Sequence, residues 1–361
     1  MTKAMVDLMA NGAYSGELAS HLAKSGSLDV GSFRPYIAED GKAYITTYMG
    51  GDRNKLESYV AKEIQANATT LRRDEWIHLD EAVLNVRRYR LGGIQDLIDN
   101  GLVYNLGNAF GTTVLEYHDV NDAFEADLTM DGLTRAQGDR ALFGVHYLPI
   151  PIIHSDYEIN SRQWEASRRL GNPLDTIHAE MAARRVMEKL ENMLFTDTTY
   201  SFGGGTIYSY LNFEPANKVS LGTAWNASAK TAAGILADVI AMKQASIDAK
   251  HYGPWKLYVP TAYETVLDED YDTTTPGTTI RERILKVDGI TGIKIIDTLP
   301  ANNVLLVQMT PDVVRLIRGM DIQNVEWQAE GKFVTKYKVM TIQVPQIRAD
   351  YNGNCGIVHL A

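Results

Sequence analysis

The chain has 361 residues, 45% of them apolar, and a formal net charge of −10. This length and apolar content predict a folded protein of one or two domains and exclude a mainly disordered chain. The acidic balance argues against a protein whose main task is to grip phosphate backbones.

The cellular compartment is indicated by two features. Cys355 is the only cysteine, so no disulfide within the chain is possible and we expect a buried, inert thiol. The N-terminus lacks a cationic segment followed by an apolar one, and no run of about 18 apolar residues is present. We therefore expect a soluble protein made and used in the cytoplasm.

The first 70 residues are rich in Gly, Ser and Ala, with few apolar residues. A turn at 39–41 and a strand over 43–48 are the clearest local elements. We interpret residues 1–70 as an arm that orders against neighbouring molecules, and we expect the rest of the subunit to fold without it.

A helix is predicted after Asp74, which is a competent N-cap. Its apolar residues recur at three- and four-residue spacing: Trp76, Leu79, Val83 and Val86. Gly92-Gly93 ends it, and a short amphipathic turn follows over 94–98. Five arginines decorate this region, and we favour a solvated or ion-paired face over a DNA contact: Arg72, Arg73, Arg87, Arg88 and Arg90.

Residues 102–148 contain β-type pieces, including 112–117, around a polar middle rich in Gly and Asp. Too few apolar residues line up to close an independent core. We therefore predict a long protruding β-hairpin that must pack on something else.

A long helix is predicted over 175–195, with an apolar stripe that we expect to face the core. The stripe consists of Ile177, Met181, Met187, Leu190 and Leu194. A second helix is predicted over 228–249. Strand and helix signals then alternate, as expected for a compact α/β unit, over 256–260, 279–285, 293–296, 304–307 and 313–317.

The segment from Lys332 to Val344 is predicted to be a long strand whose apolar phase slips by one residue. Tyr337 and Val339 share one face, whereas Met340, Ile342 and Val344 share the other. Either a β-bulge or a strand whose two halves pack on different layers explains the slip.

Three local patterns resemble chemical sites but lack a needed residue. His178-Ala179-Glu180 has no second histidine at zinc-protease spacing. Asp268, Asp270 and Asp272 lack the glycine and the bidentate glutamate of a calcium loop. Gly203-Gly204-Gly205 lacks the following lysine of a phosphate-binding loop. We therefore expect no catalytic residue, no metal site and no cofactor.

The order of segments from Val145 to Phe213 supports a family resemblance. VHYLPIPIIHSDYEINSRQW is followed by the long helix, a glycine-rich loop and IYSYLNF. This order resembles the tailed-phage major capsid family with the Hong-Kong-97-like fold, and most closely its encapsulin-like branch. LRRDEWIHLD at 71–80 and the segment 255–297 extend the resemblance over residues 71–361. The extra arm is the departure, since compact encapsulins generally lack it.

The resemblance implies an α+β fold in which an α/β axial domain is inserted into a peripheral domain with a spine helix and long strands. The implied divisions are an N-terminal arm at 1–70, N-terminal helices at 71–101, an extended loop at 102–148, a discontinuous peripheral domain at 149–225 and 318–361, and an axial domain at 226–317.

The implied function is that of a major capsid protein in the head of a tailed bacteriophage, assembled in the bacterial cytoplasm. Its implied partners are other copies of itself in pentamers and hexamers, a portal protein, a scaffold or decoration protein, and packaged double-stranded DNA bound without sequence specificity. An encapsulin shell around a cargo enzyme is the alternative. A cytoplasmic α/β enzyme that uses residues 250–317 is a third hypothesis, from another class.

Overall fold

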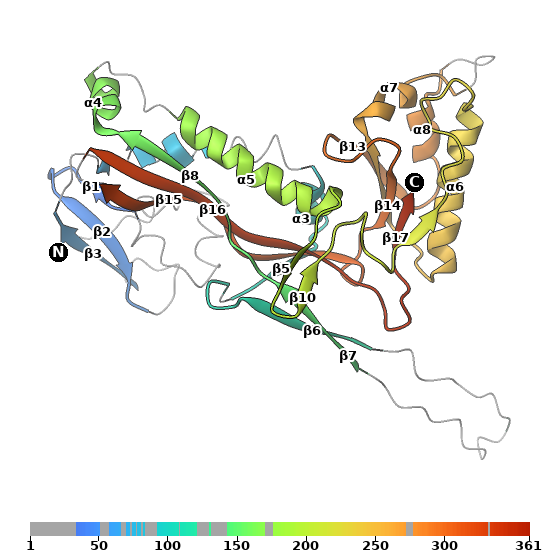
Figure 1. The fold of residues 1–361 in the computed structure, drawn as a ribbon, viewed down its shortest axis with the longest axis horizontal. Coiled ribbons are helices and arrows are strands. Elements are labelled where there is room, and N and C mark those ends of the chain that lie inside the picture. The colour runs from blue at the N-terminus through green and yellow to red at the C-terminus, as the bar shows by residue number, and fades with distance from the viewer. Residues whose placement is uncertain are drawn as a thin grey trace.

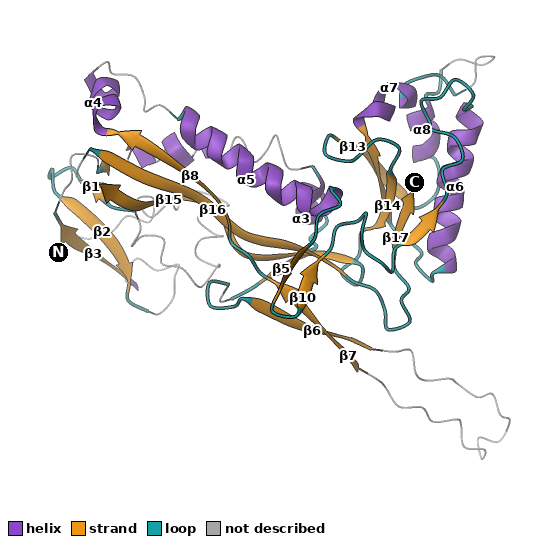
Figure 2. Cartoon of the chain, in the orientation of Figure 1, coloured by secondary structure: helices purple, strands orange, loops and turns teal. Residues whose placement is uncertain are grey.

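The computed structural model describes thirteen stretches of the chain, with residues 34–50, 58–65, 70–72, 74–76, 78–80, 82–83, 92–107, 109–120, 130, 143–169, 176–271, 277–330 and 333–361. A long helix lies along a sheet of long strands, a second α/β unit stands at one end, and a two-stranded hairpin projects from the other face (Figure 1). Figure 2 shows helices along the sheet of long strands and in the α/β unit.

The spine of the molecule is a four-stranded sheet with one helix packed on it. Its strand order is β5 (Val103–Asn105), β15 (Val314–Glu330), β16 (Val334–Ile347) and β8 (Ile153–Asn160). Helix α5 (Ile177–Phe195) covers one face and contacts both β8 and β16. Val186, Leu190 and Leu194 are buried there, as the 3.6-residue period requires for a helix with one apolar face.

The buried stripe of α5 differs from the predicted one at its N-terminal end. Ile177 and Met181 are each 59% exposed, so these two assignments are wrong. Ala179, Ala182 and Ala183 occupy the buried positions instead. Because alanine is small, the first turns of the helix approach the sheet closely, and the larger side chains point outward.

The structure explains the predicted slip of the apolar pattern in the long strand, β16, by the packing of that strand. The register shifts of the β15–β16 pair fall at Arg318/Met320, Met320/Gln323 and Glu326/Gln328, so the extra residues lie in β15 and not in β16. Along β16 buried and half-buried residues alternate up to Val339, after which the strand is buried on both faces. The two halves of β16 thus pack in different layers, opposite bulges of the partner strand.

The α/β unit is built on a five-stranded sheet. Its order is β11 (Asn217–Val219), β17 (Ile357–Leu360), β14 (Val304–Gln308), β12 (Trp255–Pro260) and β13 (Ile290–Ile296). Helices α6 (Ala232–Asp248), α7 (Glu264–Leu267) and α8 (Ile280–Leu285) accompany it, and a short 3-10 turn spans Thr261–Tyr263. Strands β12 and β13 are parallel, and α7 and α8 lie in the connection between them.

Three boundaries in this region differ from the predictions. Helix α6 begins at Ala232, because the side chain of Thr231 accepts a hydrogen bond from the N–H of Gly234 at 3.1 Å and caps the helix. The predicted strand at 313–317 is the start of β15 in the other sheet. The last strand, β17, lies between β11 and β14 instead of with the long strands.

Residues preceding Trp76 form a small sheet on the subunit itself. Its order is β3 (Tyr59–Ile64), β2 (Ala43–Tyr48), β1 (Tyr36–Ile37) and β4 (Leu71–Arg72). Tyr36, Tyr44 and Leu71 share a buried cluster with Trp76 and Tyr337. Residues 74–76, 78–80 and 82–83 are helical, as predicted.

A buried ion pair strengthens this attachment. Arg34 contacts Asp80 at 2.8 Å and donates to the backbone oxygen of Asn324 at 2.7 Å. Its guanidinium also lies 4.8 Å from the centre of the Trp76 ring. The expectation that the arm orders only against neighbours is therefore wrong for its described strands. The sparse apolar residues suffice here because they share a core with the spine.

The predicted hairpin is present as β6 (Val114–Val120) and β7 (Phe143–Pro149), which pair antiparallel. A second, shorter hairpin of β9 (Tyr200–Phe202) and β10 (Gly205–Ile207) packs beside β7. Residues 121–129 and 131–142, which belong to the predicted extended loop, lie outside the described residues. Helix α4 (Ser161–Arg169) and helix α3 (Gly93–Asp99) complete the fold. In the described part of the chain, no helix is long and apolar enough to cross a membrane.

Candidate functional site

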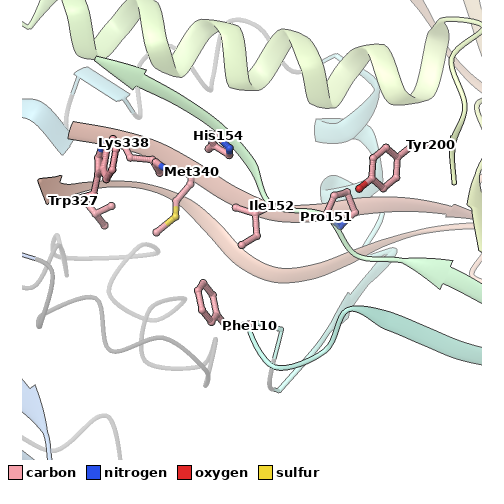
Figure 3. Close-up of a pocket in the computed structure, with 9 residues that line it drawn as sticks. Phe110, Pro151, Ile152, His154, Tyr200, Trp327, Lys338 and Met340 are labelled. Atoms are coloured by element: carbon pink, nitrogen blue, oxygen red, sulfur yellow. The ribbon is translucent and has the colours of Figure 1, made fainter. Parts of the chain in front are cut away.

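A groove of about 500 Å³ lies on the sheet face opposite to α5. Met340 and Val325 belong to the apolar cluster of that face, whereas Val339 belongs to the cluster under α5. Figure 3 shows side chains from strands β15, β16, β8 and β9 around the groove, with Phe110 pointing up from below. The lining residues are Phe110, Pro151, Ile152, His154, Tyr200, Val325, Trp327, Lys338 and Met340.

The two basic side chains of the groove, Lys338 and His154, contact the same carboxylate. The Lys338 ammonium lies 4.7 Å from the centre of the Trp327 ring and 3.6 Å from Asp156. His154 lies 3.4 Å from the same carboxylate. Lys338 and His154 therefore share one acidic partner, and the remainder of the lining is apolar. Such a surface suits an apolar segment with polar flanks better than a small polar substrate.

The β6–β7 hairpin carries an exposed apolar stripe, which we define as Phe143, Val145 and Tyr147. These side chains are 65%, 47% and 43% exposed and lie on one face of β7, since they alternate along the strand. At the base of the hairpin, a Cβ at Gly205 would lie 2.1 Å from the Tyr147 backbone oxygen. Only glycine permits this approach, which holds the hairpin base against β10.

The outward face of α5 is a second exposed apolar surface. Ile177 and Met181 are one helical turn apart, and both point away from the sheet. Arg184 and Arg185 follow, and each pairs with Glu188, at 2.8 and 3.0 Å.

The residues singled out for metal chemistry are not brought together. His178 is exposed, and Glu180 accepts a hydrogen bond from the Thr176 hydroxyl at 3.0 Å. Asp268 pairs with Arg281 at 3.0 Å, and Asp270 forms a β-bridge with Thr279, while Asp272 is outside the described residues. Among the residues described, no group of His, Cys, Asp or Glu side chains is arranged to hold a metal ion.

The glycine segment and the cysteine have structural surroundings. Gly203 and Gly204 have φ values of 60° and 80° and form the turn between β9 and β10. Left-handed backbone of this kind favours glycine. Cys355 is buried, and burial raises the pKa of its thiol to about 12, so it stays protonated and is a poor nucleophile at neutral pH.

Of the five arginines before and after Trp76, the described residues include Arg72. Arg72 is exposed, and its backbone N–H donates to Glu75 at 2.6 Å. Arg73, Arg87, Arg88 and Arg90 lie outside the described residues. The preference for a solvated or ion-paired face over DNA contact therefore stays a prediction.

Sequence reasoning missed a buried charged cluster where α3 meets both α5 and the five-stranded sheet. Asp96 of α3 contacts Lys256 at 2.7 Å and Lys294 at 2.9 Å, and the Tyr258 hydroxyl donates to it at 3.1 Å. Glu191 of α5 accepts from two backbone N–H groups of α3. One signal was available in the sequence, because Glu191 falls within the apolar stripe of the helix, where a charge needs a partner.

Comparisons with known proteins agree with this architecture. A family model described as a family of unknown function (DUF6260) matches residues 65–360. A search of curated proteins found no match. Among solved structures, the virus-like particle from Pyrococcus furiosus is 19% identical with a TM-score of 0.58, over 79% of this chain and 99% of that one.

Two capsids give similar results. The capsid of Myoviridae phage XM1 is 9% identical with a TM-score of 0.58, over 75% of this chain and 92% of that one. The capsid of the native GTA particle is 12% identical with a TM-score of 0.51, over 75% and 90%. These identities are too low to carry function, but the shared fold spans nearly all of each relative. The chain thus belongs to the DUF6260 family and has the Hong-Kong-97-like fold of capsid and virus-like-particle proteins.

Proposed function

We propose that this chain is a shell-forming subunit and, more specifically, the major capsid protein of a tailed bacteriophage head. In this proposal the four-stranded sheet with α5 is the peripheral domain, and the five-stranded sheet is the core of the axial domain. The β6–β7 hairpin is the base of the extended loop. The subunit would assemble into a closed icosahedral shell around double-stranded DNA, with a portal protein and a scaffold or decoration protein as further partners.

The observation that carries the proposal is the β6–β7 hairpin with its exposed apolar stripe. Two strands cannot bury an apolar face by themselves. The stripe remains 43–65% exposed in the isolated subunit. The groove on the four-stranded sheet is a concave and largely apolar surface, and its shape is complementary to a protruding apolar stripe. A second copy of the chain that covers both would bury them together, and symmetry repeats the contact around a shell.

A specific observation also favours the alternative, an encapsulin-like nanocompartment. The Pyrococcus particle is matched over 99% of its length and with higher identity, at 19%, than the capsid of phage XM1, at 9%, and the capsid of the GTA particle, at 12%. The region before residue 65 points the other way, since it adds a folded sheet to the subunit. The two functions share one assembly and differ in what the shell contains.

Electron microscopy of the purified full-length protein tests the shared part of the proposal. We expect closed particles, or pentamers and hexamers. A monodisperse monomer by light scattering at high protein concentration would contradict shell formation.

The contents of particles from the native host separate the two functions. DNA that is protected from nuclease, with portal and terminase genes nearby, supports a phage head. A protein that copurifies inside the particles and is encoded next to the shell gene supports a nanocompartment.

A further inference from the structure

Two arginines are neighbours on the sheet face opposite to α5. Arg315 of β15 lies opposite Gln346 of β16, and the N–H of Arg348 donates to the backbone oxygen of Val313 at 2.8 Å. Arg348 is therefore the diagonal neighbour of Arg315, and both side chains point to one face of the sheet. Ile317, two residues after Arg315, belongs to the apolar cluster of that face. We call the two side chains the arginine pair.

Each guanidinium of the arginine pair lies over a tyrosine ring. The guanidinium of Arg315 is 4.8 Å from the centre of the Tyr104 ring, and that of Arg348 is 5.9 Å from the centre of the Tyr117 ring. Both arginines are half-buried, and Tyr104 is 44% exposed. The rings thus hold the two positive charges at the surface, where a ligand can reach them.

The arginine pair lacks an acidic partner in its own subunit. Arg315 donates to the side-chain oxygen of Gln346 at 2.5 Å, and Arg348 donates to the backbone oxygen of His118 at 3.3 Å. Within the stretches that the structure describes, neither guanidinium forms an ion pair with an Asp or Glu side chain. Burial and the charge of Arg348 lower the pKa of Arg315, as expected for like charges close together. Each guanidinium has five N–H donors, so most remain available for an anion.

We propose that the arginine pair binds an Asp or Glu carboxylate of a second copy of this chain. The inference rests on the proposed shell formation and names one contact within it. The fork of a guanidinium matches the two oxygens of a carboxylate. A carboxylate between two uncompensated guanidiniums removes the repulsion between them, so both partners gain from the contact.

The charge of the chain favours this ligand over the phosphates of a nucleic acid. With a net charge of −10, the surface repels a polyanion and offers many carboxylates to a neighbouring subunit. The composition of the site agrees, because Arg and Tyr are enriched in contacts between proteins. Since Tyr117 and His118 belong to β6, the contact would hold the neighbouring subunit at the base of the hairpin.

Assembly of the full-length protein tests whether the arginine pair lies in an interface. Arg315→Gln/Arg348→Gln removes both charges and keeps polar side chains. We expect the subunit to remain folded by circular dichroism, and the protein concentration needed for particle formation to rise by about tenfold or more. Arg281→Gln/Arg283→Gln is the matched control and should assemble normally, because these half-buried arginines have partners in their own subunit.

Crosslinking identifies the ligand and remains decisive if the glutamine variant does not fold. Arg315→Lys/Arg348→Lys introduces amines that a carbodiimide joins to a carboxylate in direct contact. Particles are assembled from a mixture of isotope-labelled and unlabelled subunits of this variant. We expect peptides in which an introduced amine is linked to an Asp or Glu of the other isotope composition. Links that occur only within one isotope composition would overturn the inference.

The remaining outcomes separate this inference from shell formation. If Arg315→Gln/Arg348→Gln assembles like the wild type, the inference is wrong and shell formation stands. If the wild type forms no particles, both are wrong. If wild-type subunits bind double-stranded DNA and the double glutamine variant does not, the arginine pair binds phosphate, and the inference of a carboxylate from a second copy is overturned.

Discussion

The five-stranded sheet and the β6–β7 hairpin differ in the exposure of their apolar side chains. Leu257, Val259 and Leu306 of the sheet are fully buried under their own helices. Phe143 and Val145 of the hairpin are 65% and 47% exposed. The sheet obtains its burial free energy when the subunit folds, whereas the hairpin can obtain it only from another molecule.

The largest expected effect is on assembly, from a charge in the apolar stripe. Val145→Asp should abolish particle formation and leave the subunit folded, because a carboxylate cannot be buried at an interface without a partner. Light scattering measures assembly, and circular dichroism measures the fold. Thr223→Asp, in an exposed loop, is the matched control and should assemble normally.

If Val145→Asp assembles like the wild type, the stripe is not an interface. If it unfolds the subunit, the hairpin contributes to the core, and the contrast between the two regions disappears.

The N-terminal strands are expected to behave like the sheet and not like the hairpin. Arg34→Ala leaves Asp80 buried without its cation, and breaking a buried pair in this way costs about 3–5 kcal/mol. Deletion of residues 1–70 should likewise destabilise the subunit, contrary to the expectation from the sequence, because it removes Tyr36 and Tyr44 from a shared core. Chemical denaturation of each variant measures the loss. If the Arg34→Ala variant is as stable as the wild type, the N-terminal strands do not contribute to subunit stability and resemble the hairpin instead of the five-stranded sheet.

A cavity in the five-stranded sheet should lower the stability of the subunit and leave the contacts between subunits unchanged. Leu306→Ala removes a fully buried side chain and should lower the free energy of unfolding by about 2–5 kcal/mol. Particles that form at low temperature should keep the wild-type geometry. A variant with normal subunit stability but altered particles would show that this sheet, too, is governed by contacts between molecules.

The smallest expected effect is the absence of covalent linkage between subunits through a lysine of the extended loop. No lysine occurs between Lys62 and Lys189, so residues 102–148 lack the amine that an isopeptide bond needs. The arginines of this region stay protonated and are poor nucleophiles. Boiled particles should give one band near 40.1 kDa on a denaturing gel, or slightly lower after trimming. A ladder that survives reducing agent would refute this.

Local patterns predicted many of the elements. The strand predicted at 43–48 is β2, and the helix predicted over 175–195 is α5. Strands β12, β13 and β14 and helices α6 and α8 of the α/β unit lie within a few residues of their predicted bounds, whereas the strand predicted at 313–317 is the start of β15 in the other sheet. The hairpin was recognised from its deficit of apolar residues. These features depend on period and composition, which a sequence displays directly.

Positions in space were harder to predict, because they depend on partners far away in the chain. The exposure of Ile177 and Met181 follows from how closely the alanines of α5 approach the sheet. The sequence displays the one-residue slip of the apolar pattern in β16, but the bulges that accompany it lie in the partner strand, β15. The groove draws residues from Phe110 to Met340, and no spacing in the sequence brings them together.

The sequence by itself determined the order of the elements, the lack of lysine in the extended loop and a family resemblance whose fold the structural matches bear out. Only the tertiary structure decided that residues before Trp76 share a core with the spine and that β17 returns to the five-stranded sheet. It also decided that Glu191 and Asp96 meet at α3. The physical reason is that periodicity states which face of an element is apolar, whereas burial of a charge or closure of a sheet depends on which distant segment covers that face.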